Sequence, residues 1–293
     1  DRYMNNFFEK IYPFTTENIN GYIRNFDLSN KSLLTVGSSG DQIINASFFD
    51  CSKYSVIDIC PYTKFYFYLK KAALITLSYD EFLCFFCFLD YPKMFEEIEM
   101  AFNLDSFEKL KPILKLLDYD SFVFWDNLFS LYSPLIIRTT FFNSDEEKIK
   151  VLKEINLYLK DEVLFDKAKI LIKDVNPDFI IGDIFEVNIS DKYDNIFLSN
   201  LGSFYDVLKL RELVNKLNFN LNDNGKMLLC YLYQTVRGSE YKNDYASIYD
   251  LNKTYDILGE YITSFESFPG VKGILFNDYF WKRDSILVYK KTK

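Results

Sequence analysis

The residues best suited to chemistry lie in and after a turn rich in glycine and serine near the N-terminus. An apolar run ends at Val36 and leads into the turn 37–40, which reads GSSG, then a short helical segment and a second apolar run that ends at Asp58. In a doubly wound sheet this order forms a nucleoside pocket, because glycine lets the backbone approach the ligand and the acid accepts hydrogen bonds from both ribose hydroxyls. The segment therefore predicts a nucleoside site.

The turn does not have the spacing of a phosphate-binding loop. A dinucleotide site needs GxGxxG, whereas here two serines separate Gly37 from Gly40, and no GK[ST] follows as in a P-loop. An acid at Asp41, directly after the turn, would repel a phosphate at this helix N-terminus. Asp41 would instead suit a cationic ligand, such as a sulfonium that carries an amino group.

A third acid, Asp183, ends the next predicted strand, where a carboxylate can accept a hydrogen bond from an adenine amino group. The carboxyl ends of parallel strands lie at one edge of a sheet, so we expect Asp41, Asp58 and Asp183 to converge on one crevice. Any one of these acids could instead cap a helix or lie in a solvated loop. Their common register with Gly37 and Gly40 favours a binding site.

The residue types that are missing restrict the reaction. The chain has no histidine, which excludes histidine-based proton transfer, Ser-His and Cys-His nucleophile pairs and most catalytic metal sites. Its five cysteines are expected to be reduced thiols. Cys84 and Cys87 form a CxxC, but a zinc site would need a second pair, so we interpret them as part of an apolar helix face and expect no metal. Proton transfer must be slight, or must use Asp, Glu, Tyr or Lys.

Alternating strands and helices position these residues. The expected strands are 33–36, 54–59, 178–183, 193–199, 226–233, 261–265 and 285–290. The expected helices are 17–22, 42–48, 62–77, 205–217 and 248–258, with a turn at 222–225 and a further segment at 270–276. This alternation predicts an α/β fold with a doubly wound, mostly parallel, Rossmann-like sheet covered by helices on both faces.

A helical insertion is expected after the second strand. Amphipathic stretches with few strand signals fill 79–173, so we divide the chain into an N-terminal helical lid (1–30), a ligand-binding Rossmann-like domain (31–78 and 174–293) and the insertion (79–173). Aromatic side chains in the insertion could form an apolar groove for a lipid or simply the core of the insertion. They are Phe85, Phe86, Phe88, Phe122, Phe124, Trp125, Phe129 and Tyr132.

Charge and hydropathy limit the partners. The formal net charge is -8 and the pI is near 4.9, with no long run of Lys and Arg, so nucleic acid is not an expected partner. No apolar run approaches the roughly 20 residues that cross a bilayer, and the first residues lack the pattern of a signal peptide. We therefore expect no transmembrane segment and a cytoplasmic protein.

The segment 33–83 resembles the S-adenosylmethionine-binding half of the betaine-lipid-type S-adenosylmethionine:diacylglycerol 3-amino-3-carboxypropyltransferase family, within the methyltransferase-like fold. Members of that family show a strand, then SSGD with Asn or Gln, a strand ending in D-x-N-P, a helix rich in Leu, Lys and Ala, and a Tyr-acid-Phe segment. The corresponding positions here are 38–42, Asp58, Pro61, 71–73 and 79–82, with weaker similarity at 196–200 and 222–229.

The resemblance implies that the ligand is S-adenosylmethionine. Its methionine and ribose parts would be lined by Gly37, Ser38, Ser39, Gly40, Asp41 and Gln42. Asp58 would hold the ribose and Asp183 the adenine. Cys60 stands where the family usually has Asn, and the chain is short beside the lipid-modifying members, so the acceptor stays open between a small molecule and a lipid.

Further polar residues are expected near an acceptor. Asn200 follows the fourth strand, and Tyr231 and Tyr233 end the fifth, so all three are candidates for orienting the acceptor, with Asn200 also beside the cofactor. The two tyrosines could equally serve strand packing. Glu17 and Tyr22 could fold over the cofactor, or could be a capping residue and a core aromatic.

Three functions remain open. The first is transfer of a 3-amino-3-carboxypropyl group, favoured by the turn 38–42 and by the segment after Asp58. The second is methyl transfer to a small molecule, although the first strand carries no acid just before Gly37. The third is a binding or interaction protein without turnover, with the insertion as a partner surface. Each makes S-adenosylmethionine the expected cofactor.

Overall fold

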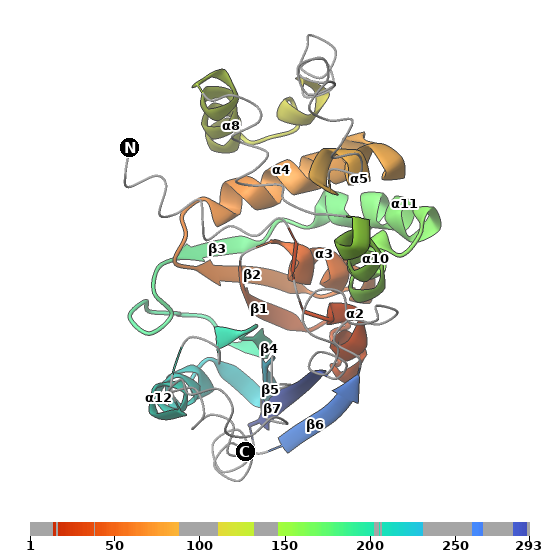
Figure 1. The fold of residues 1–293 in the computed structure, drawn as a ribbon. Helices are drawn as coiled ribbons and strands as arrows, with labels where there is room; N and C mark the ends of the chain where they lie inside the picture. The colour runs from red at the N-terminus through yellow and green to blue at the C-terminus, as the bar shows by residue number, and fades with distance from the viewer. Residues whose placement is uncertain are drawn as a thin grey trace, which may run out of the picture.

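A seven-stranded sheet forms the centre of the structure, in the strand order β3-β2-β1-β4-β5-β7-β6 (Figure 1). The computed structural model describes residues 14–15, 17–37, 39–87, 111–131, 146–201, 205, 207–230, 260–265 and 284–291. The strands are β1 (Ser32–Val36), β2 (Lys53–Asp58), β3 (Asp178–Ile181), β4 (Tyr193–Phe197), β5 (Leu221–Leu229), β6 (Glu260–Phe265) and β7 (Asp284–Lys290). Strands β1 to β5 pair in parallel, and β7 runs antiparallel between β5 and β6. The predicted α/β fold with a doubly wound, mostly parallel, Rossmann-like sheet is confirmed.

The chain reverses its direction of progression across the sheet at β1. This strand pairs with β2 on one side and with β4 on the other. The chain therefore runs from β1 to β2 and β3 at one edge of the sheet, and then continues with β4 and β5 on the other side of β1. In an open α/β sheet the crevice at such a switch point, outside the carboxyl ends of the strands, is where ligands bind. The turn 37–40 follows β1 at this point.

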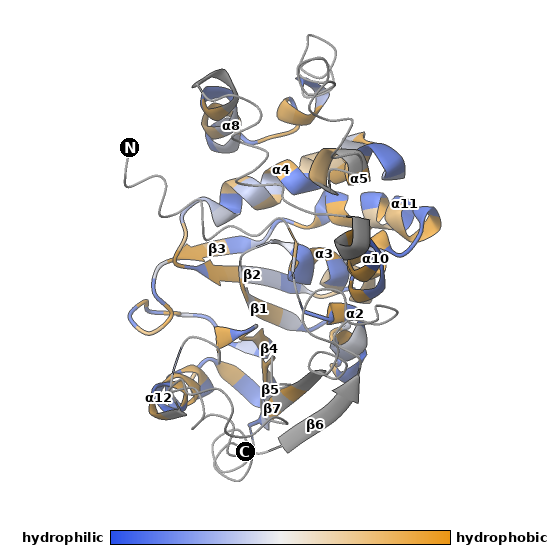
Figure 2. Cartoon of the chain, in the orientation of Figure 1, coloured by the Kyte–Doolittle hydropathy of each residue, from blue (hydrophilic) through white to orange (hydrophobic). Residues whose placement is uncertain are grey.

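Helices cover both faces of the sheet because successive strand residues point to opposite sides. Val56 packs with α3 (Asp41–Ala46), α4 (Thr63–Thr76), α10 (Glu146–Ile155) and α11 (Glu162–Leu171), whereas Ile57 and Leu34 pack with α12 (Val207–Asn218). Figure 1 shows α12 on one side of the sheet and α3, α10 and α11 on the other. Hydrophilic and hydrophobic residues alternate along α11 and α12, as expected of helices that cover a sheet (Figure 2).

The helices between β2 and β3 share one core with α4. Buried side chains of α5 (Tyr79–Cys87), α8 (Tyr119–Leu131), α10 and α11 belong to the same cluster. Of the aromatic set, Phe86 and Trp125 are buried there, Phe85 and Phe124 pack against it, and Phe122 is exposed. Phe88 and Tyr132, and the side chains of Phe129, Cys84 and Cys87, lie outside the described residues. The division of the chain into lid, binding domain and insertion stays a prediction.

Several predicted boundaries are wrong by a few residues. The first helix, α2 (Ile19–Tyr22), starts after its cap Asn18, and α4 begins at Thr63, two residues beyond Pro61. The turn expected at 222–225 lies inside β5, where the pairing jumps from Tyr193↔Leu221 to Asn195↔Lys226. Segments 248–258 and 270–276 lie outside the described residues. In the part of the chain that is described, no helix is long and apolar enough to cross a membrane.

A buried ion pair joins four separate segments of the chain. Asp41 Oδ1 lies 2.6 Å from Lys70 Nζ, and neither side chain is exposed. Lys70 also donates to the carbonyl of Ser39 at 3.2 Å. Asp41 accepts further hydrogen bonds from the Thr15 backbone N–H (2.7 Å) and the Tyr158 hydroxyl (2.7 Å). The pair therefore connects the turn after β1, α4, the N-terminal segment and the 3₁₀ helix Leu157–Leu159.

Replacing Lys70 with Met is expected to lower the free energy of unfolding by about 3 to 5 kcal/mol, because Asp41 would remain as a buried charge without a cation. Urea denaturation measures this change. The exposed Lys160→Met variant is the control and should unfold like the wild type. The double variant Asp41→Asn, Lys70→Met should recover part of the loss, and a Lys70→Met protein as stable as the wild type would contradict this role.

Candidate functional site

Gly37 lets the carboxylate of Asp58 lie directly against the backbone at the end of β1. The N–H of Gly37 donates to the carbonyl of Ile57 at 2.9 Å, which extends the β1–β2 pairing by one residue. A Cβ at Gly37 would collide with Asp58 Oδ2 and lie 2.6 Å from Thr63 Cγ2. Glycine is required here for this close approach.

The carboxylate of Asp58 is held in place by the turn that follows β2. Its Oδ1 accepts a hydrogen bond from the backbone N–H of Cys60 at 2.8 Å, and its side chain is partly exposed. Cys60 is buried, and this burial raises the pKa of its thiol, so it is a poor nucleophile. The D-x-C-P segment thus orients the acid at the strand end.

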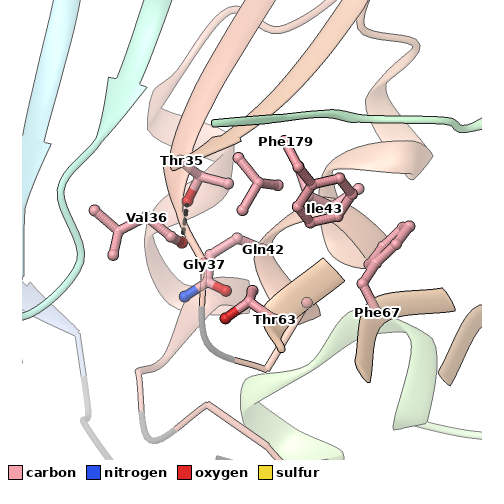
Figure 3. A pocket seen from close by; sticks show the side chains of 10 residues that line it. Thr35, Val36, Gly37, Gln42, Ile43, Thr63, Phe67 and Phe179 are labelled. Carbon is pink, nitrogen blue, oxygen red and sulfur yellow. Dashed lines mark hydrogen bonds between the residues drawn. The ribbon is translucent and has the colours of Figure 1, made fainter. Parts of the chain in front are cut away.

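A small cavity lies between the turn after β1 and the start of α4 (Figure 3). Figure 3 shows the Gln42 amide and the Thr63 hydroxyl beside Gly37, with Ile43, Phe67 and Phe179 on the far side. The residues that line it are Thr35, Val36, Gly37, Gly40, Gln42, Ile43, Val56, Thr63, Phe67 and Phe179.

Two polar side chains at this cavity lack hydrogen-bond partners. Gln42 is 1% exposed and Thr63 is 2% exposed, yet neither polar atom of the Gln42 amide, nor the Thr63 hydroxyl, has a partner among the described residues. Leaving a buried polar group unsatisfied costs about 1 to 3 kcal/mol, and native structures contain few such groups. The cavity beside them is therefore a candidate binding position. The sequence predicted Gln42, but Thr63 was missed, because a threonine at a helix start usually serves as a cap.

Asp183 lies beside Asp58 at the adjacent strand end. Asp58 pairs with Ile181 across β2 and β3, and the N–H of Gly182 donates to the carbonyl of Asp58 at 2.9 Å. The partly buried Asp183 accepts from the N–H of Phe185 at 2.9 Å and so fixes the loop after β3. Ile59 (51% exposed) and Ile181 (43% exposed) place apolar side chains beside the two acids. Sequence reasoning missed these isoleucines, although each lies within two residues of its acid.

Asp41 is a member of the buried network and does not line the cavity. Both of its oxygens accept hydrogen bonds from protein groups, and its side chain is fully enclosed. Gly40, before it, has a φ of 77°, the left-handed conformation that glycine adopts without strain. Ser39 is buried, and its hydroxyl accepts from the Asp41 N–H at 3.2 Å. The structure therefore gives the Asp41 charge a protein partner, Lys70, in place of the cationic ligand that the sequence suggested.

Glu17 is a second buried acid, located where β4 and β5 end. Tyr22 donates to its carboxylate at 2.9 Å, the Ser199 hydroxyl also donates to it, and the Cys230 sulfur lies 3.5 Å away. Burial raises the pKa of Glu17 to about 7, opposed by the hydrogen bonds from Tyr22 and Cys230 and by the nearby Gln42 amide. Gln42 thus approaches Glu17 without a hydrogen bond of normal geometry.

Of the remaining predicted site residues, the structure describes only Asn200. Asn200 is partly buried and directly follows Ser199, whose φ of 53° marks a strained loop position. Ser38, Tyr231 and Tyr233 lie outside the described residues. Within the described ranges, no group of three or more His, Cys, Asp or Glu side chains could hold a metal ion.

Comparison with known proteins gives similarity at the level of the fold. No protein-family model matches the chain, and no curated protein matches it. Among solved structures, the chain is similar to the N-methyltransferase NodS from Bradyrhizobium japonicum WM9, with a TM-score of 0.42 and 9% identity over 94% of this chain and 93% of that one. It is also similar to the rRNA methyltransferase aviRa from Streptomyces viridochromogenes, with a TM-score of 0.41 and 8% identity over 94% and 85%. At TM-scores below 0.5 these similarities carry no argument about function.

The raised pKa of Glu17 predicts how stability depends on pH. The folded protein keeps this proton up to about pH 7, whereas an unfolded chain loses it near the usual pKa of 4.5. The folded state therefore binds more protons in this window, and Glu17 lowers the free energy of unfolding by about 3 kcal/mol as pH rises through it.

Urea denaturation between pH 4.5 and 8 measures this effect. The Glu17→Gln variant should lack the decline, so it should gain stability relative to the wild type as pH rises. Parallel pH profiles for the two proteins would contradict the assignment.

Proposed function

We propose that this chain is an S-adenosylmethionine-dependent transferase. The observation that supports it most is the contact of the Asp58 carboxylate with Gly37 at the switch point of the sheet. Beside this contact, Gln42 and Thr63 present buried polar groups without partners. An acid and unsatisfied donors at this position suit the ribose hydroxyls of a nucleoside.

Each part of the cofactor has residues suited to it. Asp58 would accept hydrogen bonds from the ribose hydroxyls. Ile59 and Ile181 would lie against the adenine, and Asp183 would accept a hydrogen bond from its amino group. The turn 37–40 would lie under the methionine part, with Ser38, Ser39 and Gly40 contributing backbone and Gln42 its amide. Asp41 would act indirectly, by holding this turn through Lys70.

The sulfonium of S-adenosylmethionine carries most of the chemistry. A nucleophile on the acceptor attacks one of the carbons bonded to sulfur, the carbon–sulfur bond breaks, and its electron pair stays on a neutral sulfur. The enzyme chiefly positions the reacting atoms about 3 to 3.5 Å apart. Such a reaction does not require histidine, which the chain lacks.

The resemblance at 38–42 and at Asp58 favours transfer of the 3-amino-3-carboxypropyl group to a small molecule or a lipid. Methyl transfer to a small molecule is the second candidate, because the methyltransferase-like fold also supports that reaction. Asn200, Tyr231 and Tyr233 are proposed to orient the acceptor. A cofactor-binding protein without turnover is the remaining alternative.

Cofactor binding tests the role of Asp58. Isothermal titration calorimetry with S-adenosylmethionine is expected to show binding by the wild type and at least about tenfold weaker binding by Asp58→Asn, which loses a charged acceptor of two hydrogen bonds. Asp50→Asn is a matched control, because Asp50 is exposed and precedes β2 at the opposite edge of the sheet. Equal affinity of the Asp58 variant and the wild type would refute the assignment.

The by-product of the reaction identifies the transferred group. The protein is incubated with labelled S-adenosylmethionine and a cell extract, and the nucleoside product is identified by mass spectrometry. Methylthioadenosine is expected if the aminocarboxypropyl group moves, and S-adenosylhomocysteine if the methyl group moves. Intact cofactor, with binding retained, would leave only the binding protein without turnover.

A further inference from the structure

Glu17 and Asp41 are the two acids that are buried among the described residues, and they differ in their partners. Asp41 is paired with Lys70. Glu17 accepts from the hydroxyls of Tyr22 and Ser199 and contacts the Cys230 sulfur, and no described lysine or arginine forms an ion pair with it. A buried carboxylate without a cation is unfavourable even when neutral donors surround it. Among the described residues, no positive charge therefore balances the Glu17 carboxylate when it is ionised.

Glu17 lies near the proposed ligand site. Ser199 follows β4, and Cys230 follows β5, so the carboxylate lies at the carboxyl ends of β4, which pairs with β1, and of β5, the next strand beyond β4. Gln42 approaches Glu17 and also lines the cavity beside Gly37. Its amide has no described hydrogen-bond partner. A ligand at the end of β1 would extend toward Glu17 past this amide.

We propose, on the basis of the proposed function, that Glu17 is the counter-charge for the cationic part of the bound S-adenosylmethionine. The positive charge is carried by the sulfonium and by the α-amino group, which lie close together in the methionine part. In the water-poor interior a carboxylate attracts such a cation strongly, even across one intervening side chain. Glu17 thus has the role that the sequence suggested for Asp41.

Binding of the cation is then coupled to loss of the Glu17 proton. The titratable groups that face Glu17 are Tyr22 on α2, Cys230 after β5 and Asp41 on α3. Asp41 has Lys70 as its partner, and both Tyr22 and Cys230 act as neutral donors near pH 6. Glu17 is accordingly the group in this cluster that changes its charge when the ligand binds.

Calorimetric titrations with three nucleosides show which positive charge Glu17 recognises, because the three differ in the cationic groups that they carry. S-adenosylmethionine carries both charges, S-adenosylhomocysteine carries only the amino charge, and methylthioadenosine carries neither. Glu17→Gln should weaken binding of S-adenosylmethionine by at least about tenfold and leave methylthioadenosine within about twofold of the wild type. The control is Glu162→Gln, an exposed acid on α11, which should bind all three like the wild type.

The pattern of losses distinguishes the possible results. A loss for S-adenosylmethionine alone identifies the sulfonium as the cation, and a loss shared with S-adenosylhomocysteine identifies the amino group. An equal loss for all three nucleosides, or no loss, would overturn the proposal. If the wild type binds none of them, the proposed function itself fails, which is a different outcome.

A measurement on the wild type covers the case in which the Glu17 variant does not fold. Titrations at pH 6 in buffers of different ionisation enthalpy give the number of protons exchanged on binding. S-adenosylmethionine should release close to one proton, because the Glu17 carboxyl is protonated before binding and ionised after it. Methylthioadenosine should release none. Proton release by both ligands, or by neither, would contradict the counter-charge role.

Discussion

The ion pair between Asp41 and Lys70 is the interaction on which the rest of the site depends. It is fully buried, so it is held by geometry and additional hydrogen bonds, and not by simple attraction between charges in water. Through it the turn after β1, α4, the N-terminal segment and the helical layer are fixed relative to one another. Thr15 is bound to Asp41, and Glu17 is two residues further along the chain, so the pair also brings Glu17 toward the strand ends.

We therefore assign different roles to the two buried acids, Asp41 and Glu17. Asp41 is paired with Lys70 and holds the turn, while Glu17 has neutral donors as its partners among the described residues and keeps its proton up to about pH 7, the pKa to which burial raises it. Gln42 lies between the second acid and the cavity, with an amide that lacks a described partner. In the proposed binding mode, Asp41 serves structural stability and Glu17 serves ligand recognition at the same end of the sheet.

The sequence is sufficient to predict which polar residues lie at the strand ends. Gly37, Asp58 and Asp183 each follow or close an apolar run, and such a pattern is local. The direction of the Asp41 side chain could not, since its partner Lys70 lies 29 residues away and is chosen by packing. From the sequence, Glu17 is expected only to cover the cofactor or to cap a helix. Its contact with Ser199 spans 182 residues, and no local pattern indicates such a pairing.

A crystal structure of the complex with S-adenosylhomocysteine would show directly where the nucleoside binds. The nucleoside is expected at the carboxyl ends of β1 and β2, with the ribose hydroxyls bound to Asp58 above Gly37 and the amino acid part directed past Gln42 toward Glu17. A ligand bound elsewhere on the sheet, or bound here without contact to Asp58, would contradict it.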